Sequence, residues 1–350
     1  MDKVRIGFVG VGGMGQCAHL TNYVTVPDCE VVALAELRKG LGQRVAARYG
    51  VPRVYENHHE LLENEQLDGI VAPQPYNRHG VLLPDLYKAG VPILTEKPLT
   101  CNIAVGERML AALGASTARH FVGYHKRSDP ATMYAKSEIE RLTQSQELGK
   151  LHYVRILMPA GDWVANGFVH LLASNESLPS LETDPLPEDM DDATKHEYNA
   201  FVNYYIHQVN LMRHLLGEDY AVSYVDPSRV VMVVVSKSGV AGTIEMSPYR
   251  TTVDWQEEAL VAFERGYVRL TLPAPLACNR PGHVAIYHDP GNGATPTQSE
   301  PQLPWIHAMR QQALNFVAAV RGKTTPLCEA AEALEDLRVA RQYVMQWKGC

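Results

Sequence analysis

The stretch Ile6-Gly7-Phe8-Val9-Gly10-Val11-Gly12-Gly13-Met14-Gly15 decides the fold of this 350-residue chain. An apolar run of strand character ends in Gly10, Gly12 and Gly15, whose G-x-G-x-x-G spacing turns a first strand sharply into a helix. Glycine lets the backbone approach a pyrophosphate closely, and the amides at the start of the following helix face an anion at the positive end of the helix dipole. The stretch predicts a dinucleotide-binding turn, with contacts from Gly10, Gly12, Gly13, Met14 and Gly15.

The acid that follows the next strand supports this interpretation. After a helix expected from about Gln16 to Val24, residues 30–35 read as a buried strand that ends in Glu36, 21 positions after Gly15. This is close to the spacing of the carboxylate that binds the adenosine ribose hydroxyls, so Glu36 favours NAD. A 2′-phosphate would be repelled there, although Arg38 could partly compensate, and NADP is disfavoured without being excluded.

Composition excludes several classes of protein. The chain is 46% hydrophobic and 20% charged, as expected for a soluble globular protein large enough for two domains. A net charge of −7 and a pI near 6.1 predict neither nucleic acid nor an anionic membrane as a partner. The six cysteines show no metal-type spacing and are interpreted as reduced thiols. Without a signal-peptide pattern or a membrane-length apolar run, we expect a cytoplasmic protein that binds no metal.

Strand and helix patterns continue to alternate through the first third of the chain and predict a doubly wound parallel sheet. The expected helices cover about 40–49, from about His59, 80–89 and 103–113, and the expected strands lie near Val54 and at 68–72, 91–94 and 121–124. Ligands bind such sheets at the carboxyl ends of the strands. The segment Pro73–His79 follows the fourth strand, and Gln74 and His79 are therefore predicted to bind the cofactor.

Thr95-Glu96-Lys97-Pro98, at the end of the fifth strand, completes a recognisable combination. The glycine turn, Glu36, this Glu-Lys-Pro and a histidine-bearing helix together resemble the Gfo/Idh/MocA family of sugar and inositol oxidoreductases. The resemblance implies an N-terminal Rossmann domain over residues 1–126 and a C-terminal α+β domain with a largely antiparallel open sheet over residues 127–350. In that family the bond before the proline is often cis and the lysine points at both nicotinamide and substrate. The resemblance carries these roles to Pro98 and Lys97, with Glu96 beside the cofactor.

The crossing into the second domain, Gly123–Pro130, resembles the same family. His125 and Lys126 occupy positions where family members often place polar residues that contact substrate. Two adjacent cations are consistent with an anionic substituent on the substrate, and equally with a solvated charge cluster at a helix start.

The second domain is expected to begin near Lys150 with a strand at 152–158, followed by Gly161-Asp162-Trp163, of which Trp163 is a candidate substrate contact. Residues 175–197 are rich in proline and acids. Loops of this kind are usually functional or mobile, so the segment is interpreted as a solvated insertion near the mouth of the site, either a lid or a decoration.

A helix expected over 198–216 carries Asn203, Tyr205, His207 and Asn210 and resembles the catalytic helix of the family. Asn203, His207 and Asn210 have the i, i+4, i+7 spacing of one helix face. The family usually has aspartate where this chain has Asn203 and Asn210, and glycine at Tyr205, so only His207 is unchanged. An imidazole can accept the proton of a substrate alcohol, whereas asparagine can orient it without supplying charge.

The remaining segments predict an antiparallel meander from strands at 229–235, 240–246, 255–263 and 267–272. A proline- and glycine-rich loop over 273–304 precedes helices at about 305–320 and 328–347, which can pack back on the first domain. The resemblance implies that subunits pair through the open sheet, as a homodimer or homotetramer.

Three functions are open on this sequence. The leading hypothesis is an NAD-dependent oxidoreductase acting on a secondary hydroxyl of a sugar, sugar derivative or cyclitol, with Lys97 and His207 catalytic and Asn203, Tyr205 and His207 near the substrate. The second is a redox-neutral NAD-dependent glycoside hydrolase, for which Tyr205, His125 and Lys126 are candidate additional acids or bases. The third is a non-catalytic nucleotide-sensing regulator, which the two asparagines keep open.

Overall fold

The computed structural model describes residues 2–349, which form two compact units. Within the described residues, unit 1 comprises 2–124, 166–195 and 309–337, and unit 2 comprises 125–165, 196–308 and 338–349. A single boundary after residue 126 therefore does not describe the units, because two later segments of the chain return to the first one. The physical reason is that these segments pack side chains against the N-terminal sheet and its helices and form hydrogen bonds with them.

Unit 1 is built on a seven-stranded sheet in the order β15-β6-β5-β4-β1-β2-β3. Its strands are β1 (Val4–Val9), β2 (Cys29–Ala35), β3 (Arg53–Tyr55), β4 (Gly69–Ala72), β5 (Ile93–Glu96), β6 (His120–Gly123) and β15 (Cys328–Glu329). Strands β1 to β6 pair in parallel, which confirms the predicted doubly wound sheet. The edge strand β15 runs antiparallel to β6 and was not predicted, since two residues carry no period.

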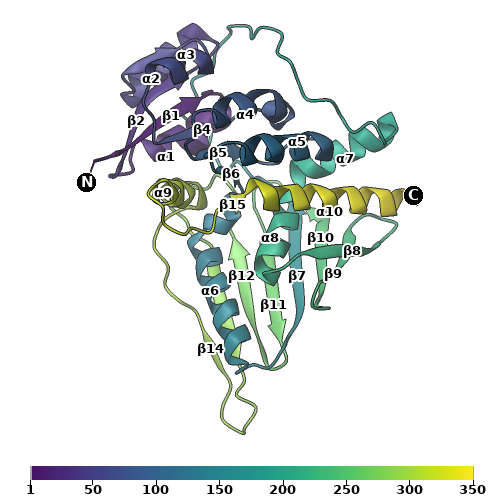
Figure 1. The fold of residues 1–350 in the computed structure, drawn as a ribbon. Coiled ribbons are helices and arrows are strands. Elements are labelled where there is room, and N and C mark those ends of the chain that lie inside the picture. The colour runs from purple at the N-terminus through teal and green to yellow at the C-terminus, as the bar shows by residue number, and fades with distance from the viewer. Residues whose placement is uncertain (1, 350) are drawn as a thin grey trace. The chain divides into compact units, whose positions relative to one another are not determined.

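Eight helical segments of unit 1 connect or flank these strands: η1 (Gly15–Leu20), α1 (Thr21–Tyr23), α2 (Lys39–Tyr49), α3 (His58–Asn64), η2 (Tyr76–Arg78), α4 (His79–Tyr87), α5 (Ile103–Gly114) and α9 (Ala308–Val320). The helix expected after the glycine turn begins as the π-helical segment η1. Helix α9 comes from far along the chain (Figure 1). Its Phe316 lies edge-on to Tyr23 and Phe121 in the core around β1. Burial of this aromatic side chain explains why the late segment belongs to unit 1.

Unit 2 is built on an eight-stranded sheet in the order β14-β13-β12-β11-β7-β10-β9-β8. The strands are β7 (Leu151–Ala160), β8 (Tyr220–Val225), β9 (Val231–Ser236), β10 (Ala241–Arg250), β11 (Glu257–Phe263), β12 (Gly266–Leu272), β13 (His283–His288) and β14 (Thr297–Ser299). The sheet is largely antiparallel, as predicted, but β7 lies between β11 and β10 and pairs with β10 in parallel. The continuous meander is therefore wrong at this point. Strands β13 and β14 also correct the prediction of a simple loop over 273–304.

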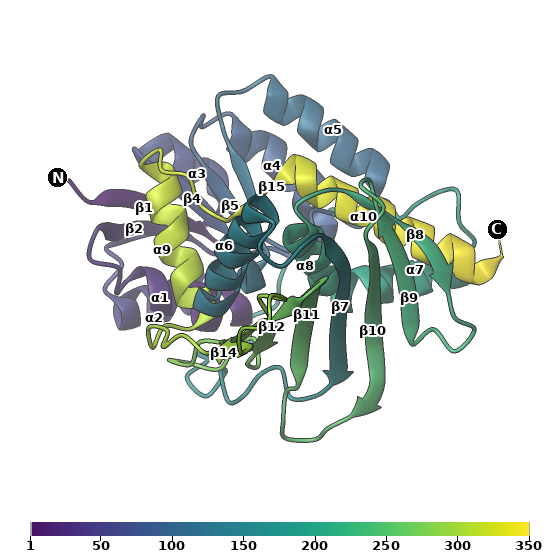
Figure 2. The same cartoon turned by 90° about the horizontal axis from the view of Figure 1, so that it is seen from below.

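Helices η3 (His125–Ser128), α6 (Pro130–Ser145), α7 (Asp192–Tyr204) and α8 (Ile206–Leu216) accompany this sheet, and α10 (Ala330–Lys348) runs from unit 1 into unit 2. Helix α6 packs beside β12, and α8 packs beside β7 (Figures 1 and 2). The single helix expected over 198–216 is instead two helices separated at Tyr205. Among residues 2–349, the helices are all too short or too polar to cross a membrane.

Candidate functional site

The glycine turn of unit 1 has the close packing that its sequence predicts. Gly10 has a φ of +96°, and a Cβ at this position would come within 2.0 Å of the Gln74 side-chain nitrogen. The same Gln74 nitrogen donates a hydrogen bond of 2.8 Å to the Val9 carbonyl oxygen. A Cβ on Gly15 would lie 2.8 Å from the Gly10 carbonyl oxygen. Gly10 and Gly15 are thus required by the turn itself, and Gln74 supports the turn from the end of β4.

The next residues of the turn present open backbone. Gly12, Gly13 and Met14 are partly exposed. The space around Gly12 is nearly empty. Among the described residues other than its chain neighbours, a Cβ on Gly12 would have one atom within 4 Å, Arg38 Nη2 at 3.9 Å. The glycine backbone is left open at Gly12, close to the start of a helical segment, which fits the pyrophosphate of a dinucleotide. The residues present therefore fit the cofactor that the sequence implies.

Glu36 lies at the end of β2, buried beside this turn. Its carboxylate accepts hydrogen bonds from the Val11 backbone nitrogen at 3.0 Å and from Arg38, through the backbone nitrogen at 3.1 Å and Nε at 2.7 Å. Glu36 is thus positioned where a carboxylate would meet the adenosine ribose. The Arg38 guanidinium donates hydrogen bonds to this carboxylate, which makes Arg38 a weaker candidate for binding a 2′-phosphate.

Strand β5 ends at Glu96, Lys97 and Pro98 follow it, and the Lys97–Pro98 peptide bond is cis. Lys97 is partly buried, and its backbone nitrogen donates to the Glu96 carboxylate at 3.3 Å. The other Glu96 oxygen pairs with His19 Nε2 at 2.6 Å, which joins the end of β5 to η1. Sequence reasoning missed His19, because its partner Glu96 is 77 positions away in the sequence.

His79 supports this segment from the start of α4. It is fully buried, with Nδ1 2.9 Å from the Leu99 carbonyl oxygen and Nε2 3.2 Å from the Gln74 carbonyl oxygen. Burial lowers the pKa of His79, so the ring is neutral at physiological pH and donates from one nitrogen. His79 therefore holds backbone on either side of the site, and the structure offers no exposed His79 atom to a cofactor.

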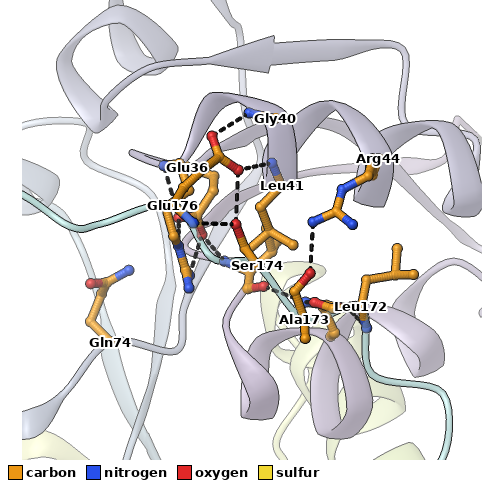
Figure 3. A network of polar contacts seen from close by, with 12 residues as sticks. Glu36, Gly40, Leu41, Arg44, Gln74, Leu172, Ala173, Ser174 and Glu176 are labelled. Atoms are coloured by element: carbon orange, nitrogen blue, oxygen red, sulfur yellow. Dashed lines mark hydrogen bonds and ion pairs between the residues drawn. The ribbon is translucent and has the colours of Figure 1, made fainter.

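The irregular chain after unit 2's first strand returns to unit 1 as a segment over residues 166–176, which we call the strap. Leu172 exchanges two hydrogen bonds with the Gln16 side chain, at 3.2 and 3.0 Å, and the Ala173 carbonyl oxygen accepts one from Arg44 at 2.7 Å (Figure 3). Phe168 lies 3.5 Å from the position of a Cβ on Gly13. The strap thus contacts the glycine turn, η1 and α2. Within the insertion expected over 175–197, Glu176 accepts a hydrogen bond from Gly40 and Asp184 accepts one from Gly80, so this segment is held to unit 1 at two points.

Unit 2 carries the predicted histidine on α8. His207 is partly buried, and its ring lies edge-on to the His125 ring with 4.7 Å between centroids. Asn210 is buried, and its side-chain oxygen accepts a hydrogen bond of 2.6 Å from Arg127 Nε. Asn203 is exposed on α7, whereas His207 and Asn210 lie on α8 beyond Tyr205, so the three residues belong to two helices.

Lys126 is not the solvated cation that the sequence allowed. It is 4% exposed and forms an ion pair with Glu257, which is fully buried on β11. Gln208 and the Trp255 indole also donate to the Glu257 carboxylate, at 2.8 and 3.1 Å. Lys126 is therefore matched inside unit 2, and its position gives no support to an anionic substrate. Glu257 and Gln208 were not predicted, because their partners are distant in sequence.

The other residues predicted for unit 2 are placed as follows. The Tyr205 hydroxyl donates to Ser247 Oγ at 2.7 Å. Trp163 is 39% exposed, and its carbonyl oxygen accepts from the Leu276 backbone nitrogen at 3.2 Å. A small pocket in this unit is lined by His125, Lys126 and Asp129 together with residues of the 272–277 turn. Burial raises the pKa of Asp129 to about 6.

A glycine turn followed by an acid at the end of β2 is the arrangement of a dinucleotide-binding Rossmann fold, and unit 1 adds a Glu-Lys-Pro segment at the end of β5. Residues 4–124 match the model of an oxidoreductase family with an NAD-binding Rossmann fold. The match lies in the N-terminal part of the chain, which is similar to this family, Gfo/Idh/MocA.

The chain is also similar to curated relatives and to a solved structure. The chain is 25% identical over 236 residues to myo-inositol 2-dehydrogenase of Thermotoga maritima, a match covering 67% of this chain and 62% of that protein. It is 25% identical to scyllo-inositol 2-dehydrogenase (NAD(+)) of Bacillus subtilis, over 70% of this chain and 67% of the relative. The crystal structure of a putative NADPH-dependent oxidoreductase from Desulfitobacterium hafniense has the same fold, with a TM-score of 0.77 at 12% identity and coverage of 99% and 96%.

Proposed function

We propose that this chain is an NAD-dependent oxidoreductase that acts on a secondary hydroxyl of a cyclitol, sugar or sugar derivative. The observation that carries the proposal is the glycine cradle beside Glu36 in a unit that also presents Lys97 at the end of β5. The relatives named above are inositol dehydrogenases, which supports a cyclitol as the first substrate to test. They give no support to the glycosidase alternative.

The chain's own residues would act as follows. The Lys97 ammonium would bind the reacting hydroxyl and polarise its O–H bond. His207 would accept the hydroxyl proton as general base, with its ring packed against His125. Bound NAD supplies the hydride acceptor, so the carbinol carbon loses its hydride as the oxygen loses its proton and a carbonyl forms. In the reverse direction, protonated His207 would return the proton to the alkoxide.

The preference for NAD is part of this proposal. Glu36 is buried, fixed to the turn by Val11 and paired with Arg38, so a 2′-phosphate at the ribose would face a carboxylate. Calorimetric titration of the purified protein with NAD⁺ and NADP⁺ tests this preference directly. We expect tighter binding of NAD⁺, and equal or tighter binding of NADP⁺ would contradict it.

The catalytic roles are tested by following absorbance of the reduced coenzyme with a panel of inositols and aldoses. Lys97→Ala is expected to abolish turnover while leaving NAD⁺ binding largely intact, and His207→Asn to lower kcat by roughly 10²–10⁴ fold. Lys88→Ala and His196→Asn remove an exposed lysine and an exposed histidine and serve as matched controls. Wild-type rates in Lys97→Ala or His207→Asn would remove that residue from the mechanism.

The same panel separates the alternative functions. Release of the aglycone from a glycoside without net formation of NADH would identify the glycosidase. Binding of NAD⁺ without turnover of any cyclitol, sugar or glycoside would favour the regulator. Oxidation of a cyclitol or sugar with accumulation of NADH is the result expected here.

A further inference from the structure

We propose that Glu176 of the strap is a specificity-determining residue that makes unit 1 discriminate against a dinucleotide carrying a 2′-phosphate. The inference rests on the proposed function, because it concerns which coenzyme the same site accepts. It assigns part of that selection to a residue more than a hundred positions away from the glycine turn in sequence.

The Glu176 carboxylate fills the N-terminus of α2. One oxygen accepts the Gly40 backbone N–H at 2.9 Å and the other accepts the Leu41 backbone N–H at 2.9 Å (Figure 3). A Cβ on Gly40 would come within 3.1 Å of this carboxylate, so the close approach depends on glycine. Free amides at a helix N-terminus attract anions such as phosphate. Here the attraction is already satisfied by an anion from the chain itself.

Glu176 and Glu36 both accept backbone hydrogen bonds from the turn that leads from β2 into the start of α2. Glu36 follows the last residue of β2, and a Cβ on Gly42 in the first turn of α2 would lie 3.3 Å from the Glu36 Cβ. The cation of this turn, Arg38, is hydrogen-bonded to Glu36. A phosphate on the ribose hydroxyl next to Glu36 would therefore meet two carboxylates, helix amides that are already occupied and an arginine that is already paired.

The strap holds Glu176 in this position through several contacts. The Ser174 hydroxyl donates to the Glu176 carboxylate at 2.8 Å, and neighbouring strap residues bind Arg44 and Gln16. The amide of Gly40 and the Ser174 hydroxyl lower the pKa of Glu176, so it is charged at neutral pH. Because the side chain is exposed, solvent screens its charge, and the expected effect on affinity is moderate.

The test compares Glu176→Gln with wild type by calorimetric binding of NAD⁺, NADP⁺, 5′-ADP and 2′,5′-ADP, with no substrate present. Glutamine keeps one hydrogen-bond acceptor for the helix amides and removes the charge. Two matched variants of the same 166–195 segment are controls. Glu188→Gln removes an exposed carboxylate elsewhere, and Asp184→Asn weakens the anchor of this segment at the N-terminus of α4, where Asp184 accepts the Gly80 N–H at 2.9 Å.

In Glu176→Gln we expect the ratio of the NADP⁺ to the NAD⁺ dissociation constant to fall by at least threefold, with the same trend for the two ADP ligands. Both controls should retain the wild-type ratio, and the gain should shrink at 0.5 M salt. A smaller fall, or an equal fall in Asp184→Asn, overturns the assignment to the Glu176 charge. Failure of the proposed function is a different result, namely a wild-type protein that binds neither dinucleotide.

Discussion

Replacement of Lys126 by methionine is a direct test of how unit 2 positions α8. The side chain is 4% exposed and pairs with Glu257, whose side chain is 0% exposed. Methionine preserves most of the apolar volume and removes the cation. Loss of one partner of a buried ion pair typically costs about 3–5 kcal/mol, because the other charge stays buried without its counter-ion. Gln208 and Trp255 still donate to Glu257, so we expect the lower end, about 3 kcal/mol.

The assay is chemical denaturation followed by tryptophan fluorescence, together with a thermal melt of the same samples. At about 2–4 °C per kcal/mol for a unit of this size, the melting temperature should fall by roughly 6–12 °C. Lys126→Met combined with Glu257→Gln should be less destabilised than the sum of the single variants, with a coupling free energy of about 2 kcal/mol. Lys136→Met is a control with the same chemical change, because Lys136 is 18% exposed and its partner on α6, Glu140, is 55% exposed.

The opposite pattern would refute this reasoning. If Lys126→Met loses less than about 1 kcal/mol while KM rises for anionic sugars and not for neutral ones, Lys126 binds substrate rather than Glu257. The ion pair would then be absent from the folded protein in solution, and the anionic-substrate interpretation of the sequence would be restored.

Three further changes probe other parts of the structure. Gly10→Ala should weaken NAD⁺ binding more than tenfold by calorimetry, since the new methyl group would come within 2.0 Å of Gln74 at a φ of +96°, and unchanged affinity would contradict the packing of the turn. Burial raises the pKa of Asp129 from 3.8 to about 6, so stability present below pH 4 is lost as pH rises through 6, by up to about 3 kcal/mol. Asp129→Asn should abolish that part of the pH dependence of unfolding, and a persistent slope would assign it to another group. Phe316→Ala should destabilise unit 1 by about 3–5 kcal/mol, and a loss below 1 kcal/mol would show that α9 does not close this core.

The parts of the fold that sequence predicts well are those specified by neighbours along the chain. Alternating strand and helix periods predict β1 to β6 in order, and the spacing after the glycine turn identifies Glu36 before any coordinates. The helix break at Tyr205 was missed because the apolar period continues through it. The pairing of β7 with β10 was missed because strand order in a mixed sheet is not encoded in the pattern of either strand.

Side-chain partners distant in sequence were also beyond prediction. The Lys126–Glu257 pair spans 131 positions, so the sequence showed a basic cluster and gave no sign of the acid that neutralises it. His79 was assigned to the cofactor because it follows a strand end, yet it is buried with its ring nitrogens 2.9 and 3.2 Å from the backbone carbonyl oxygens of Leu99 and Gln74. In each case the sequence identifies the charged group or the ring, but it does not predict the burial of that group or its hydrogen-bonding partner.

Two acids in the segment after residue 166 accept hydrogen bonds from the N-terminal amides of helices far away in the sequence, which the composition of the segment does not reveal. Glu176 receives two amides at the start of α2, and Asp184 receives the Gly80 amide at the start of α4. Both acids act as N-caps supplied from far along the chain, which offsets the orphan donors and the positive end of each helix dipole. They differ in surroundings, since Asp184 is buried near Thr100 whereas Glu176 is exposed beside the turn that carries Glu36. The same capping chemistry therefore anchors the segment at α4 and, at α2, leaves a charge where a coenzyme phosphate would have to bind.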